Sequence, residues 1–182
     1  MEYFKIITLK NGKECCLRNG TEHDGQAVFE NFNLTHEQTD YLLSYPDENS
    51  MDVEQESRFL KERAESENEI ELIALVDGVV AGTAGIEAAG GKYKLKHRAE
   101  FGIGVDKAYW GLGIGRGLLD ACIACARNAG YTQLELDVAA ENERAVMMYK
   151  RAGFIEYGRN PRGFCSRKTG YQELIYMRLE LQ

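Results

Sequence analysis

The stretch from Ala99 to Ala129 constrains the fold of this chain more than any other part of the sequence. It begins with apolar residues up to Val105, interrupted by Glu100, which indicates a buried strand. Four glycines follow at every second position, and from Ile114 onward apolar residues recur at steps of three and four. The pattern therefore predicts a strand, a glycine-rich turn and an amphipathic helix, in that order.

A glycine-rich turn that leads into a helix N-terminus is typical of an anion-binding site. The first helical N–H groups have no partner within the helix, and the helix dipole gives that end a partial positive charge. Glycine also lets the backbone approach a pyrophosphate closely. We therefore predict that the backbone of this turn binds a phosphorylated cofactor. The run comprises Gly111, Leu112, Gly113, Ile114, Gly115, Arg116 and Gly117.

Two well-known phosphate-binding patterns do not fit this turn. The dinucleotide pattern GxGxxG fails, because its sixth position falls on Arg116 or, counted from Gly113, on Leu118. The P-loop pattern requires GxxxxGK followed by Ser or Thr, and the chain contains no such run. The Arg116 side chain either adds charge to the site or is solvated, and the sequence favours neither reading.

The run YWGLGIGRGLL resembles the acetyl-CoA signature of the GNAT (Gcn5-related N-acetyltransferase) superfamily, R/Q-x-x-G-x-G/A. Gly113 and Gly115 fall on its two small positions, whereas Trp110 stands where the signature has Arg or Gln. The segment from Leu134 to Phe154 is similar to the next strand and helix of that family, and it contains the pattern N-x-x-A-x-x-x-Y-x-x-x-G-F from Asn142 onward. Two blocks in the same order as in the family make this resemblance specific.

The resemblance implies an α/β fold: a single GNAT-like domain over residues 1–182 with a mixed sheet flanked by helices. The sheet is expected to be mostly antiparallel, with two central parallel strands that splay apart around acetyl-CoA. Asn11-Gly12 predicts a hairpin over residues 3–18, which is expected to extend the sheet. Helices are expected near 22–33, 52–67, 114–128 and 143–152, with a further short helical segment at 35–44.

The resemblance also implies acetyl transfer from acetyl-CoA to a primary amine of an unidentified small molecule or protein. Tyr149 matches the family's general acid, which reprotonates the leaving thiolate, and it is also expected to bind the cofactor. Asn142 is expected both to cap its helix and to bind the cofactor. The splayed strand is expected to pair with the pantetheine amides and to polarise the thioester carbonyl through a backbone N–H. We place this contact at Ile103, Gly104 and Val105.

Acetylation of an amine at neutral pH favours a general base. A lysine-like amine with a pKa of about 10.4 is protonated at pH 7, so freeing its lone pair costs roughly 4–5 kcal/mol. Glu100 is the candidate, because it is the only acid within the apolar strand and lies where many family members have a glutamate facing the acceptor. Glu87 and the C-terminal carboxylate are alternatives, and an outward-facing Glu100 without a catalytic role stays open.

The charge and cysteine content limit the partners of this chain. The 22 basic and 29 acidic side chains give a net charge of −7, which argues against nonspecific binding to nucleic acid or to an anionic membrane. No apolar run approaches the roughly 18 residues of a membrane span, and no secretory leader is evident, so we expect a cytoplasmic protein. Cys122 and Cys125 lie on the apolar side of their helix without further ligands, so no metal is expected.

Several questions stay open from the sequence alone. A basic run from Arg159 to Lys168 is predicted to be a loop, which is either solvated, a lid, or a site for an acidic group of the acceptor. A noncatalytic acyl-CoA-binding sensor or interaction module is the alternative to an enzyme, although the presence of Tyr149 and Glu100 favours an enzyme. Family members often dimerise, so a homodimer is compatible with the resemblance.

Overall fold

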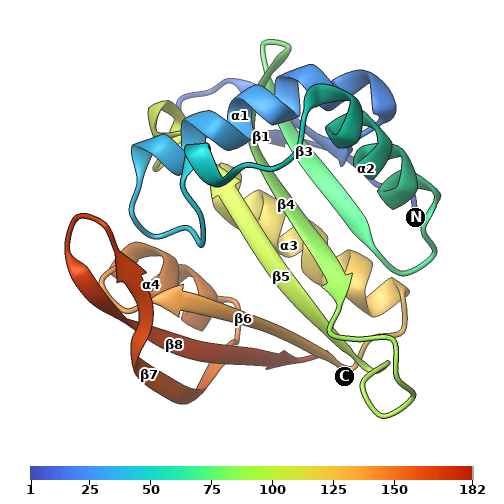
Figure 1. Ribbon diagram of the computed structural model, residues 1–182. Helices are drawn as coiled ribbons and strands as arrows, with labels where there is room; N and C mark the ends of the chain where they lie inside the picture. The colour runs from blue at the N-terminus through green and yellow to red at the C-terminus, as the bar shows by residue number, and fades with distance from the viewer. Residues whose placement is uncertain (182) are drawn as a thin grey trace.

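Eight strands form one sheet, in the order β1-β2-β3-β4-β5-β6-β8-β7, in the computed structural model, which describes residues 1–181 (Figure 1). Neighbouring strands are antiparallel except β5 and β6, which run parallel. The strands are β1 (Phe4–Thr8), β2 (Glu14–Asn19), β3 (Ile70–Val76), β4 (Val79–Ala88), β5 (Arg98–Val105), β6 (Gln133–Ala139), β7 (Ile155–Ser166) and β8 (Gly170–Glu180). The helices are α1 (Gly25–Gln38), α2 (Val53–Glu65), α3 (Ile114–Asn128) and α4 (Glu143–Arg151).

The two central parallel strands separate soon after they meet. β5 pairs with β6 at three positions, the last of which joins Glu100 to Glu135. Beyond Glu100, β5 stays paired with β4 as far as Val105, while β6 stays paired with β8 as far as Ala139. The gap between them widens toward the glycine-rich turn (Figure 1). This arrangement confirms the predicted mixed sheet with splayed central strands.

Helices cover both faces of the sheet because the strands are apolar on both sides. Leu72 and Ala74 of β3 face the large core built around α3, whereas Ile73 between them packs with Val28 of α1 and Leu60 of α2. This alternation is the two-residue period of a strand. α3 therefore lies on one face and α1 and α2 on the other (Figure 1). Within residues 1–181, no helix combines the length and apolar character needed to cross a membrane.

Two local predictions are wrong, and both concern polar segments. α1 continues without a break to Gln38, so the separate helical segment at 35–44 is absent; the hydroxyl of Thr35 donates to the Phe32 carbonyl within the helix (3.0 Å). The basic run at 159–168 belongs mainly to β7, which extends to Ser166. Arg159 donates to Glu173 of β8 (2.9 Å) and Arg167 pairs with Asp47 (2.7 Å), so acids from other parts of the chain neutralise two cations of a run that looks like a loop in isolation.

Candidate active site

The backbone of β5 presents unpaired groups to the gap beside β6. At its two ends, Ala89 N–H donates to the Arg98 carbonyl (3.1 Å) and Asp106 N–H donates to the Ala81 carbonyl (2.9 Å). Hydrogen bonding alternates along an antiparallel ladder, so even-numbered residues from 98 to 106 bond to β4 and odd-numbered residues face away. The odd-numbered residues Phe101, Ile103 and Val105 therefore direct their N–H groups into the gap.

This alternation separates the three residues that we expected to bind pantetheine. Ile103 and Val105 face the gap, as that prediction requires, whereas Gly104 lies opposite Thr83 and turns its amide toward β4. Phe101, which the sequence reading passed over, is the further residue of this edge. The period-two count from Val105 back to Glu100 is the signal that would have identified it.

The turn before α3 has the geometry of an anion site. Gly111 and Gly113 adopt left-handed backbone angles, with φ of +84° and +107°, and Gly113 is the N-cap of α3. The next three N–H groups, those of residues 114–116, have no intrahelical acceptor. Gly117 N–H, in contrast, already donates to the Gly113 carbonyl (3.0 Å).

Gly117 has a packing role, and its predicted contact with the cofactor stays a prediction. A Cβ on this residue would lie 2.6 Å from Cδ1 of Ile7, so its missing side chain lets α3 approach the sheet. The turn itself is anchored from two sides. The Leu112 carbonyl accepts a hydrogen bond from Lys10 N–H (3.0 Å), and Ile114 is buried in the core.

Basic and aromatic side chains surround the glycine turn. The Trp110 indole N–H donates to the Val105 carbonyl (2.7 Å), which joins the turn to the end of β5. The Arg144 guanidinium lies 5.5 Å from the centre of the Trp110 ring and close to Gly111, so α4 contributes a cation that the sequence reading missed. The Arg116 side chain is exposed and pairs with Asp120 (2.9 Å).

Tyr149 lies behind the gap, on the side of the sheet that carries α3. Asn142 caps α4, its Oδ1 accepting from Ala145 N–H (3.3 Å), and so fixes the helix that carries Tyr149. The Tyr149 ring packs edge-on against Phe101, with centroids 6.1 Å apart, and against Phe154 at 5.8 Å. Burial raises the Tyr149 pKa well above its ordinary value, and its hydroxyl has no hydrogen-bond partner among residues 1–181.

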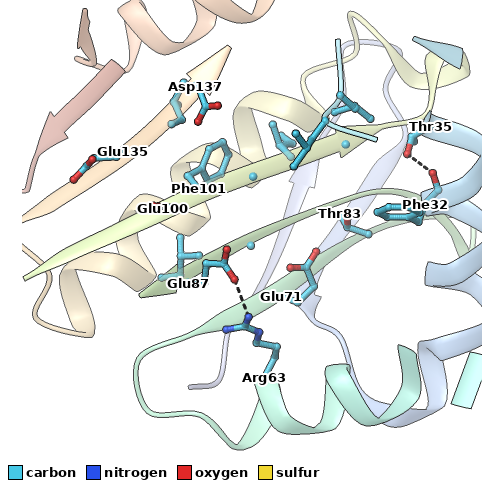
Figure 2. A pocket seen from close by; sticks show the side chains of 18 of the residues that line it. Phe32, Thr35, Arg63, Glu71, Thr83, Glu87, Glu100, Phe101, Glu135 and Asp137 are labelled. Atoms are coloured by element: carbon cyan, nitrogen blue, oxygen red, sulfur yellow. Dashed lines mark hydrogen bonds and ion pairs between the residues drawn. The ribbon is translucent and has the colours of Figure 1, made fainter. Parts of the chain in front are cut away.

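A cleft with a volume of about 650 Å³ lies on the opposite face of β5, between α1, α2 and strands β3 to β6 (Figure 2). The strand register places Glu87, Glu100 and Glu135 side by side across its floor. Arg63 donates to Glu87 (3.0 Å) and Arg98 donates to Glu135 (2.6 Å). Glu100 has no ion-pair partner within residues 1–181, and partial burial, followed by the neighbouring carboxylates, raises its pKa.

The sequence reading missed four acids of this cleft, which are Glu56, Glu71, Glu135 and Asp137. The pattern that identified Glu100, a single acid inside an apolar strand, also occurs at Glu71 and could have identified it. Asp137 follows Glu135 by two residues, so the two share a face of β6. Within residues 1–181, no group of three His, Cys, Asp or Glu side chains is arranged to hold a metal ion.

The segment between α1 and α2 bridges the cleft to the β7–β8 hairpin. Gln172 of β8 donates to the Asp40 carbonyl (3.2 Å), and the Asp40 carboxylate also accepts from Ser166 at the end of β7. Arg167 pairs with Asp47 (2.7 Å). Segments far apart in the chain thus hold the two sides of the cleft together. No local sequence pattern predicts this contact.

Comparisons with known proteins agree with this geometry. The sequence model described as the acetyltransferase (GNAT) family matches residues 32–154, about two thirds of the chain. The acetyltransferase of the GNAT family from Streptococcus pneumoniae has a TM-score of 0.87 at 27% identity, over 91% of this chain and 99% of that one. YncA from Salmonella typhimurium, solved with its cofactor acetyl-CoA, has a TM-score of 0.81 at 22% identity, over 92% and 94%.

A curated relative matches a shorter part of the sequence. The mycothiol acetyltransferase of Propionibacterium freudenreichii subsp. shermanii is 50% identical over 52 residues. The match covers 29% of this chain and 17% of the relative, so most of that protein has no counterpart in the match.

Proposed function

The chain belongs to the GNAT family of acetyltransferases, and from that premise we propose that it moves an acetyl group from acetyl-CoA directly to a primary amine. One observation carries the proposal. The unpaired edge of β5 connects an anion site at the start of α3 to a cleft lined with carboxylates on the other face. Acetyl-CoA is anionic and needs positive or N–H-rich surroundings, whereas a protonated amine needs negative ones. The start of α3 provides the first, and the carboxylate-lined cleft provides the second.

The residues at the gap suit acetyl-CoA, which supplies an activated acetyl thioester. The N–H groups of Ile114, Gly115 and Arg116 are available to its pyrophosphate, and Arg144 adds a positive charge beside the turn. Odd-numbered residues of β5 offer N–H groups and carbonyls to the pantetheine amides. A Cβ at Gly115 would make only ordinary contacts, the nearest 3.5 Å from the Met148 sulfur, so the surrounding packing does not require glycine at this position.

In the proposed reaction, Glu100 and Tyr149 transfer protons in opposite directions from the two sides of β5. Glu100 accepts a proton from the amine, and its raised pKa makes it a stronger base than an ordinary carboxylate. The amine nitrogen then bonds to the acetyl carbon as the C–S bond breaks. Tyr149 donates its hydroxyl hydrogen to the leaving sulfur; its raised pKa keeps that hydrogen in place at neutral pH. A gap-facing N–H of β5 stabilises the developing oxyanion.

Substitution of Gly113 tests the anion site. Gly113→Ala and Gly130→Ala both place a side chain at positive φ, +107° and +82°, with no atom within 4 Å of the new Cβ. Each should therefore destabilise the fold by about 1–2 kcal/mol. Calorimetry should show coenzyme A binding at least tenfold weaker for Gly113→Ala than for the natural protein, and unchanged binding for Gly130→Ala. Equal affinities of the two variants would contradict the assignment of this turn.

The proposed function is tested by thiol release from acetyl-CoA with a primary amine, in the natural protein and in Tyr149→Phe. Release should depend on the amine, and the variant should lose roughly 10²–10⁴-fold in kcat because it lacks the donor to sulfur. Tyr131→Phe is the matched control: that tyrosine is also buried, but its hydroxyl bonds to Asn68 (2.8 Å), away from the gap. Coenzyme A binding without amine-dependent release would contradict an amine acetyltransferase.

Replacement of Glu100 tests the base. In Glu100→Gln the fraction of neutral amine in solution limits the reaction, so kcat/KM should rise about tenfold per pH unit toward the amine pKa. Activity should thus appear at higher pH than in the natural protein, and the difference between them should shrink above pH 9. Glu62→Gln, on the exposed side of α2, is the control. A profile identical to that of the natural protein would remove Glu100 as the base.

A further inference from the structure

The cleft holds more negative charge than its own cations neutralise. Six carboxylates line it, whereas its two guanidinium groups, those of Arg63 and Arg98, are already paired with acids. Within residues 1–181, four of the six have no ion-pair partner. These four are Glu56, Glu71, Glu100 and Asp137. One of them, Glu100, is the proposed base. The proposed reaction gives the other three no role.

Glu56 and Glu71 form a pair at the α2 end of the cleft. Glu56 is 6% exposed, lines the cavity, and has no hydrogen-bond or ion-pair partner for its side chain in the described part of the chain. Burial, followed by repulsion from Glu56, raises the pKa of Glu71 to about 7, against a hydrogen bond from Thr83 and the more distant charge of Arg63. A buried carboxylate without a partner is costly. A bound cation would relieve that cost.

The path from this pair to Glu100 is open. Glu71 lies opposite Gly85, and Gly85 lies opposite Gly102, two residues beyond Glu100 on the same face. Strand spacing and rise place the Cα atoms of Glu71 and Glu100 about 12 Å apart. The Glu71 carboxylate leans over Gly85, since a Cβ there would lie 2.1 Å from its Oε2, and a Cβ on Gly102 would meet nothing within 4 Å. Figure 2 shows Glu71 and Glu87 along this part of the cleft.

We propose that the acceptor is a small diamine, whose reacting amine lies beside Glu100 while its second, protonated amine binds Glu56 and Glu71. The proposal rests on the amine acetylation proposed above. Two nitrogens separated by four or five carbons lie about 6–8 Å apart when extended, which suits two residues whose Cα atoms are about 12 Å apart and whose side chains reach into the same cleft. The segment that bridges the cleft to the β7–β8 hairpin favours a small molecule over a folded protein surface.

The test compares 1,4-diaminobutane with butylamine as acceptors for acetyl-CoA at pH 7.5. Two equivalent nitrogens give the diamine a statistical factor of two. A second binding site should raise the ratio of kcat/KM values, diamine over butylamine, to twentyfold or more. Added salt should lower the ratio, because the contact is ionic.

Two variants locate the second site. Glu71→Gln and Glu56→Gln should each reduce the kcat/KM ratio at least fivefold, whereas Glu62→Gln on the exposed side of α2 should leave it unchanged. A ratio near two in the natural protein, or a ratio unaffected by both variants, overturns the diamine proposal and leaves amine acetylation intact. If neither amine is acetylated, the diamine proposal is overturned. In that case, other amines that release thiol preserve the proposed function, and a failure of every amine overturns it as well.

Discussion

The candidate active site depends on the separation of β5 from β6 after three paired positions. Each strand is held by its outer neighbour, β5 by β4 and β6 by β8, so both can leave the shared ladder without fraying. Aromatic packing occupies the space behind the gap, where Phe101 meets Tyr149 and Tyr149 meets Phe154. The sheet therefore carries unpaired backbone groups at its centre, where a polar ligand can satisfy them at little cost in stability.

The gap also divides the site by charge. The helix dipole of α3, Arg144 and the free N–H groups make the glycine turn favourable for anions. The cleft across β5 carries carboxylates of which several have no cation partner in residues 1–181, so it favours cations. One strand thus separates two binding regions of opposite sign, and Glu100 and Phe101, adjacent in sequence, point to opposite faces. In the proposed mechanism, this separation keeps the base, Glu100, and the acid, Tyr149, on opposite sides of β5.

The parts of the fold that sequence patterns predict are those that local chemistry determines. Asn11-Gly12 turns the chain between β1 and β2, with Gly12 at a φ of +85°, and Asn142 caps α4 through its own side chain. The misassigned parts depend on partners distant in sequence. The packing of Gly117 against Ile7 joins residues that are far apart in the sequence. The basic run at 159–168 looks like a loop in isolation, but it belongs mainly to β7, which pairs with β8. Glu56 and Glu71 line the same cleft because α2 packs on β3.

Backbone amide exchange, resolved by NMR with and without acetyl-CoA, tests the central claim most directly. The claim is that the unpaired edge of β5 and the start of α3 together bind the thioester substrate. Exchange should slow at Ile103 and Val105 and at residues 114–116, whereas Gly104, already paired with β4, should change little. Unchanged exchange at both Ile103 and Val105, with protection elsewhere on the molecule, would contradict the account.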